Sequence, residues 1–477
     1  MVMGRGWTGF DAAALQRATG QSVREFAERL GVDPKTVSNW RSRGHSVELR
    51  SLTTELLEIT LGRVNSEQRA EFLRIIANPS SLDTETIIDS ESPYLPTQSG
   101  VDGWAVHTPA GRFYPGASTP TVLVSAQINA GRVLASTDAG LLQHPVLARP
   151  QRGLVVAVAV AAEETPNYFA LDRRRVRARL AASNPGAPIL IPTAYRLDDF
   201  SYAILWAVTN LDDALLDDDA ELSAAENRLV AHDPAATVEH VAAQDSALST
   251  VSRMWLGSHY CARHILAHLD QLRDAPAIWT REQRGEEAAT WLLFAHKYRY
   301  LATTAARFAG TGTEQCRVFC IPPDAVAASK RAERVLMLLA AALIESVDIT
   351  VVVCSEPEYT ATHGFVLDPG RRAIVASWAN TDHVRVDVTD HRPTLREYSD
   401  ATGWARAHTV LAAAEPGQRL RHLADYLELD WTWVTTRARE FADTGAAGLS
   451  PPRSRLLTLT GVDHACRFLG DLAHQGR

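Results

Sequence analysis

The sequence predicts a multidomain protein with an all-α N-terminal domain, an α+β region, a mixed α/β region and a helical tail. Three observations favour this fold class. The chain has 477 residues, which is enough for about three domains of ordinary size. Apolar residues recur at helical spacing between residues 10 and 76, and the pattern then stops. Beyond residue 100, short β-type runs bounded by glycine and proline indicate strands.

Two helix starts follow each other closely near the N-terminus. Ser22 and Glu25 form a capping-box motif at the start of the first helix. Gly31 can adopt the left-handed conformation that ends this helix, and Asp33 followed by Pro34 supplies an N-cap and a first-turn proline for a second one. The sequence therefore predicts two short helices joined by a tight turn.

The second of these helices has one apolar and one polar face. Val37 and Trp40, three residues apart, are expected to face the core. The polar residues that remain can contact phosphates and base edges if the helix enters the major groove of DNA. The candidate DNA-binding residues are Lys35, Thr36, Ser38, Asn39, Arg41 and Arg43, with Ser22 and Arg24 at the start of the first helix.

This segment resembles the Cro/C1-type (XRE family) helix-turn-helix, in the form common in actinobacterial transcriptional regulators. The matching positions are Ser22, Phe26, Ala27, Leu30, Gly31, Val32, Thr36, Val37, Ser38, Trp40 and Gly44. The resemblance implies a five-helix domain, residues 1–77, that binds a double-stranded DNA operator as a homodimer and regulates transcription. Val23 and Arg41 depart from the Gln and Glu that the family often has, so the family's base contacts are not carried over. The alternative is a helical hairpin that only packs.

The segment that follows is expected to be an acidic linker, residues 78–100. No basic residue lies between Arg74 and Arg112, whereas several carboxylates do, so the linker would be repelled by a polyanion. Any DNA contact is therefore expected before it.

The rest of the chain is predicted in three parts. Residues 101–245 form an α+β domain. Residues 246–415 form an α/β sensor or dimerisation domain, with a strand–helix–strand unit between residues 316 and 354 and a hairpin at residues 364–378. Residues 416–477 form a helical tail. The order of elements in residues 288–413 resembles the regulatory domains that follow this helix-turn-helix, which implies a small-molecule effector.

Charge and hydropathy limit the classes of protein. The chain has 48 Lys+Arg and 56 Asp+Glu, a net charge of −8, so it is not a basic nucleic-acid-coating protein and its DNA contact must be local. The longest apolar runs are shorter than the roughly 20 residues that a membrane helix needs. No signal peptide is evident, and five scattered cysteines fit reduced thiols. We expect a cytoplasmic protein that does not enter a membrane.

Two further groups of residues are candidate sites. Cys261, His264 and His268 share one face of a predicted helix and suit zinc or iron, but ordinary packing is the simpler interpretation, and no metal or cofactor is expected. The aromatic residues between 291 and 300, with Trp378, suit a ligand pocket or a dimer interface, with Arg371, Arg372 and His383 near Trp378 in sequence.

Seven acidic residues lie between Asp212 and Glu226 without one basic residue among them, which is typical of a solvated surface.

No phosphate-binding loop, dinucleotide fingerprint or nucleophile motif is present, so an enzyme is not expected. Two alternatives to a regulator stay open: an enzyme tethered to DNA, and an antitoxin or other partner-binding protein. Groups with strongly shifted pKa values converging in a cleft would favour the enzyme. An enclosed apolar pocket would favour a sensor, and a broad exposed apolar patch would favour partner binding.

Overall fold

The computed structural model of the chain divides into two compact units, Met1–Pro93 and Tyr94–Arg477. Each unit has a core of its own. The residues that the structure describes are 7–19, 21, 23–43, 47, 49, 51–64, 68–69, 72, 76, 95–98, 103–129, 132–137, 140–159, 166–182, 184, 186–230, 238–241, 248–312, 314–378 and 383–475. Of the predicted acidic linker, residues 78–100, only 95–98 lie among them.

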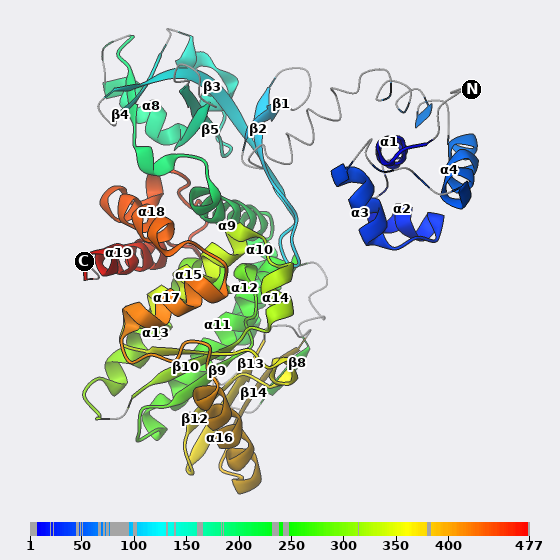
Figure 1. The fold of residues 1–477 in the computed structure, drawn as a ribbon. Coiled ribbons are helices and arrows are strands. Elements are labelled where there is room, and N and C mark those ends of the chain that lie inside the picture. Colours follow the sequence, from blue (N-terminus) through cyan, green and yellow to red (C-terminus); the bar gives the residue numbers. More distant parts are fainter. Residues whose placement is uncertain are drawn as a thin grey trace. The chain divides into compact units, whose positions relative to one another are not determined.

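The Met1–Pro93 unit is helical throughout its described elements (Figure 1). These helices are α1 Gly9–Ala18, α2 Val23–Leu30, α3 Pro34–Arg43 and α4 Ser51–Arg63. Four helices have described bounds in this unit, and the predicted all-α five-helix domain is wrong. The helix count came from a family resemblance, whereas the local residue pattern specified only the two helices on either side of the turn.

Two mixed sheets form the framework of the Tyr94–Arg477 unit. The first sheet runs β1-β2-β3-β4-β7, and β5 pairs in parallel with β3 and in antiparallel with β6. Its strands are β1 Thr97–Gln98, β2 Trp104–Thr108, β3 Ala117–Asn129, β4 Arg132–Ala135, β5 Leu154–Ala159, β6 Asn167–Asp172 and β7 Ile189–Ile191. The alternation of buried and more exposed residues along β4 shows that one face of this sheet packs on the core.

The second sheet has the order β11-β10-β9-β12-β13-β14-β8. Its strands are β8 Val238–Val241, β9 Ala277–Thr280, β10 Cys316–Cys320, β11 Thr350–Cys354, β12 Phe365–Asp368, β13 Arg372–Ser377 and β14 His383–Thr389. Strands β9, β10 and β11 are parallel, and the others pair antiparallel. The predicted strand–helix–strand unit is confirmed as β10, α15 and β11, and the predicted hairpin is confirmed as β12 and β13.

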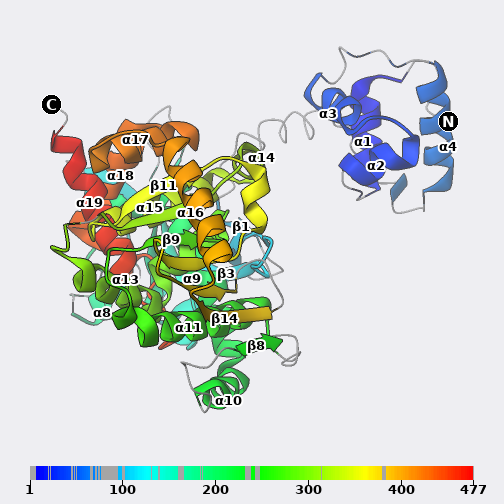
Figure 2. The same cartoon turned by 90° about the horizontal axis from the view of Figure 1, so that it is seen from below.

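Helices cover the sheets and join them. They are α7 Pro145–Ala148, α8 Arg173–Ala182, α9 Asp199–Asp217, α10 Asp219–Val230, α11 Thr250–His268, α12 Gly285–Leu293, α13 Ala295–Phe308, α14 Pro323–Ala328, α15 Arg331–Glu345, α16 Arg392–Ala407, α17 Pro416–Tyr426, α18 Trp431–Thr444 and α19 Thr460–Gln475. Helix α16 packs on one face of the second sheet through Leu395, Tyr398, Ala401 and Ala405 (Figure 2). The other face of that sheet shares a continuous core with the first sheet.

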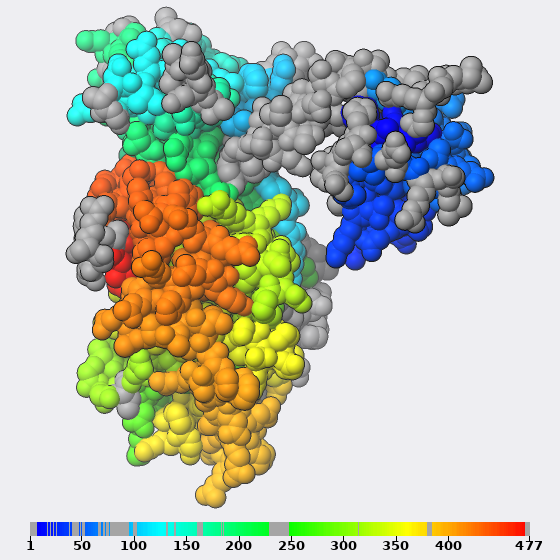
Figure 3. All heavy atoms as spheres, viewed as in Figure 1, coloured from blue at the N-terminus to red at the C-terminus, as the bar shows by residue number. Residues whose placement is uncertain are grey.

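Helix α15 lies at the centre of this shared core. It contacts α9, α12, α17 and α19, and its residues from Val335 to Glu345 are all buried. An apolar run on every side of a helix is what such a central position requires. The tail helices, orange to red in Figure 3, therefore belong to the same packed body. The predicted fold class, with an α+β region followed by a separate α/β region and a tail, is wrong because long-range pairing and packing merge these parts.

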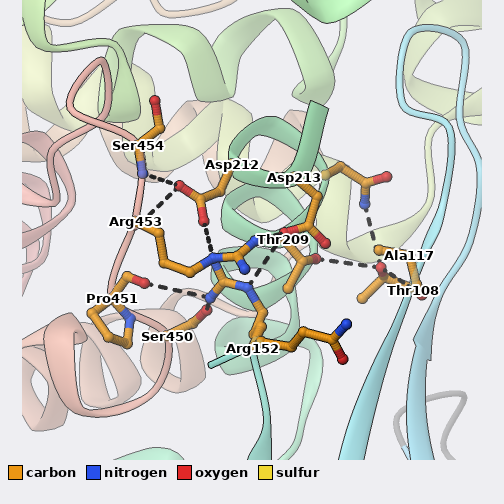
Figure 4. A network of polar contacts seen from close by, with 12 residues as sticks. Thr108, Ala117, Arg152, Thr209, Asp212, Asp213, Ser450, Pro451, Arg453 and Ser454 are labelled. Atoms are coloured by element: carbon orange, nitrogen blue, oxygen red, sulfur yellow. Dashed lines mark hydrogen bonds and ion pairs between the residues drawn. The ribbon is translucent and has the colours of Figure 1, made fainter. Parts of the chain in front are cut away.

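A buried ion-pair network fastens the segment before α19 to α9 (Figure 4). Asp212 is fully buried on α9 and accepts hydrogen bonds from the guanidinium of Arg152, at 2.5 Å, and from Nε of Arg453, at 3.0 Å. Its other oxygen accepts from the backbone N–H groups of Arg453 and Ser454, at 2.8 and 2.7 Å. The predicted solvated acidic surface is therefore wrong at Asp212.

None of the described helices combines the length and the apolar character that crossing a membrane requires.

Candidate nucleic-acid interface and buried cationic cavity

The turn between α2 and α3 has the geometry that its residues predict. Gly31 has φ of +65°, in the left-handed region that glycine adopts without a steric penalty. The N–H of Val32 donates to the carbonyl of Ala27, at 3.0 Å, and thereby caps the end of α2. The carboxylate of Asp33 accepts from the N–H of Lys35, at 2.8 Å, and caps the start of α3. The described residues thus form two short helices joined by a tight turn.

Packing fixes which face of α3 turns outward. Val37 and Trp40 are 0% and 3% exposed and pack with Phe26, Ala27 and Leu30 of α2. Side chains on the opposite face of a helix must then point away from this core. The buried tryptophan alone removes a large apolar surface from water, so rotation of α3 about its axis is strongly disfavoured.

The structure places the predicted DNA-binding residues as follows. Lys35 and Asn39, four residues apart on α3, are exposed, and Thr36 is half-buried. Arg24 is exposed on α2. No acidic residue lies in the first turn of α3, and the negative charge nearest to its N-terminus is the capping carboxylate of Asp33. The side chains of Ser22, Ser38, Arg41 and Arg43 lie outside the described residues, as does the capping box of Ser22 with Glu25.

The metal-candidate residues lie on buried positions of α11. His264 and His268 have rings 4.6 Å apart; Nε2 of His264 lies 3.3 Å from the carbonyl oxygen of Asp387, and Nδ1 of His268 lies 2.9 Å from that of His264. Burial raises the pKa of the Cys261 thiol, which disfavours the thiolate that binds metals. Within the described ranges, no group of three or more His, Cys, Asp or Glu side chains could hold a metal ion.

The aromatic cluster singled out in the sequence lines a buried cavity. Trp291 of α12, Lys297 and Tyr300 of α13, and Trp378 after β13 all face it, although they come from separate segments. Arg371 and Arg372 do not line it: Arg371 is exposed, and Arg372 donates a hydrogen bond to Gln271. The side chain of His383 lies outside the described residues.

The ammonium group of Lys297 is held in this cavity by several contacts. Lys297 is 3% exposed, and its Nζ donates to Glu282 Oε1 at 2.9 Å and to Thr290 Oγ1 at 2.8 Å. The ammonium also lies over the rings of Trp291 and Trp378, 4.0 and 4.6 Å from their centroids. Burial lowers the pKa of Lys297, and the charge of Glu282 opposes this shift. Lysine is rare in this chain, so a lysine within a run of aromatic residues was a usable signal that the sequence interpretation did not follow.

Three polar residues of the cavity were missed in the sequence. Arg281 and Glu282 directly follow β9, and Arg317 lies within β10, where it pairs in register with Ile278. Polar residues immediately after a buried strand are a recognised signal for a binding site. An arginine inside a strand gives no such signal, because the sequence alone does not show that both faces of that strand are buried.

Comparison with known proteins leaves the function to be argued from these residues. No protein-family model matches the chain, and no match is found among curated proteins or solved structures. The two features that carry chemistry are the outward face of α3 and the cationic cavity.

Proposed function

We propose that the chain is a sequence-specific DNA-binding transcriptional regulator of the Cro/C1 (XRE) type, acting as a homodimer. The observation that carries this proposal is the pair Lys35 and Asn39, which share the exposed face of a helix whose other face is held by Val37 and Trp40. An asparagine can pair with adenine through two hydrogen bonds, and a lysine can neutralise a phosphate. In this proposal α3 enters the major groove, and two copies contact half-sites about one helical turn apart.

The Tyr94–Arg477 unit would then supply dimerisation and the response to a small-molecule effector. Its cavity has apolar walls and a few converging polar groups, which is the composition of sites that bind small ligands. An effector regulates DNA binding only if it binds one arrangement of the protein better than another. The direction of regulation follows from whichever arrangement the effector favours.

Selection from a randomised duplex pool, followed by fluorescence anisotropy with the enriched duplex, tests the proposal. We expect the wild-type chain to enrich a two-fold symmetric sequence. Lys35→Ala should weaken binding of every duplex and lower the slope of log affinity against log salt by about 1. Asn39→Ala should instead reduce the preference for the enriched duplex over a scrambled one, by about 1 to 3 kcal/mol.

Arg371→Ala is the matched control, because it removes one exposed positive charge from the other unit. It should leave both the salt slope and the preference unchanged. The proposal fails if no sequence is enriched, or if Lys35→Ala and Arg371→Ala have the same effect.

A further inference from the structure

Arg317 is a buried arginine without a carboxylate partner. It is 1% exposed, and within the described part of the chain no carboxylate oxygen forms an ion pair with it. Its one hydrogen bond runs from Nη2 to the hydroxyl of Tyr300, at 3.3 Å, and its Nε has no partner. A guanidinium in a buried strand with an unused donor is an unusual and costly arrangement.

Other buried arginines of the unit show how such a charge is normally accommodated. Arg152, Arg419 and Arg437 are 7%, 7% and 3% exposed, and each forms an ion pair with a buried or half-buried carboxylate. Arg173 instead donates from two nitrogens to backbone carbonyls. Arg317 has neither kind of partner, so its unmet charge is a feature of this cavity and not of the whole fold.

The cavity as a whole has an excess of positive charge. Lys297 and Arg317 line it together with one carboxylate, Glu282, and Arg281 lines it beside Glu287, so the guanidinium of Arg317 is left without a counter-charge. The carboxylate of Glu282 is already bound by Lys297. Glu287 lies near Arg281 but is not part of the cavity wall, and its oxygen accepts from the backbone N–H groups of residues 283 and 284. The lining groups therefore favour an anion.

Aromatic and apolar side chains make up the remaining walls. The guanidinium of Arg317 lies 4.3 Å from the ring centroid of Trp291, whose Nε1 is a second buried donor without a partner. Ala262 and Ile265 of α11 line the same cavity. The cavity is small, which suits a compact ligand.

We infer that this cavity binds a compact aromatic carboxylate, whose oxygens accept hydrogen bonds from Arg317 and Trp291 and whose ring packs among the apolar side chains. The anion supplies the counter-charge that Arg317 lacks, and a flat body fits a space bounded by tryptophan rings. The role of this cavity as the effector site of a regulator rests on the proposed function. Ligand binding itself is measured without DNA, so the two can fail separately.

Calorimetry and thermal unfolding of the full chain at constant ionic strength test the inference, with benzoate as the probe and benzamide as its uncharged counterpart. Benzoate should bind and raise Tm by roughly 2 °C or more at saturation, and benzamide should not. Arg317→Met should weaken benzoate binding about tenfold or more. Without ligand this variant should unfold at or above the wild-type Tm, because it removes an unpaired buried charge.

Arg307→Met is the matched control, because Arg307 is exposed on the same helix as Lys297. This substitution should leave benzoate binding unchanged. Trp378→Leu is a second test that does not alter Arg317, and it should also weaken benzoate binding. The inference is overturned if benzoate gives neither heat of binding nor a Tm shift. It is also overturned if benzamide or inorganic phosphate binds as tightly as benzoate. It is also overturned if Arg317→Met and Arg307→Met bind benzoate equally.

Discussion

Replacing Asp212 tests whether the buried ion-pair network holds the end of the chain in place. Asp212→Ala removes the acceptor of four hydrogen bonds, two from guanidinium groups and two from backbone N–H groups (Figure 4). Arg152 would remain buried with Asp213, 3.8 Å away, as its nearest carboxylate. Burial already lowers the pKa of Arg152, and Asp212 is the largest influence that opposes this shift.

The expected loss follows from that geometry. Removing one partner of a buried ion pair costs about 3 to 5 kcal/mol, because the other charge stays buried. Since Asp213 and the hydroxyl of Ser450 still contact Arg152, we expect the lower end, about 3 kcal/mol. Two orphaned backbone donors in the segment before α19 should also increase its local opening.

Urea unfolding of the full chain, followed by tryptophan fluorescence and by hydrogen exchange of α19, measures both effects. Asp217→Ala is the matched control, because Asp217 is exposed at the end of the same helix and should change stability by about 0.5 kcal/mol or less. If Asp212→Ala falls within about 1 kcal/mol of this control, the network does not have the role assigned to it.

Three further predictions concern other parts of the chain. Burial raises the pKa of Glu287 to about 7, above its ordinary 4.5, so the folded state holds the proton more tightly and stability falls as pH rises between these values. The free energy of unfolding of Glu287→Gln, measured in urea, should therefore rise by up to about 3 kcal/mol relative to that of the wild type between pH 4.5 and pH 8. A stability difference that stays constant over this pH range would contradict the prediction. All five cysteines are buried, so a thiol reagent should react slowly with the native protein, whereas in urea it should react with all five thiols. A fast reaction with the native protein would show that the thiols are not buried. Gly31→Ala should destabilise the α2–α3 turn by about 1 kcal/mol or more, because φ is +65° there; an unchanged helix-melting curve by circular dichroism would argue against the turn.

Local residue chemistry accounts for what the sequence predicted well. Gly31, Asp33 and Pro34 specify a helix end and a helix start through groups only a few residues apart, and the structure has that turn. Alternating and continuous apolar runs likewise predicted β10, α15 and β11, since burial of a strand or helix face depends on residues within the element. The outward positions of Lys35 and Asn39 follow from the same helical spacing.

The number of helices around that turn was not predictable in this way. It was implied by a resemblance, and the described residues show four helices where five were expected. The predicted regions beyond residue 100 are also joined by a distant pairing, that of β8 in the first region with β14 in the second.

The sequence by itself thus determined the elements that local spacing encodes, the helix-turn-helix turn above all. Only the tertiary structure decided which charged side chains pair, because an ion pair needs its atoms within a few ångströms whatever their separation in the chain. Asp212, in an acidic run that predicted a solvated surface, meets Arg152 and Arg453, which are 60 and 241 residues away. Arg317, an ordinary strand residue in the sequence, becomes a buried cation without a carboxylate partner once β10 pairs with β9 and Trp291 of α12 packs against its guanidinium.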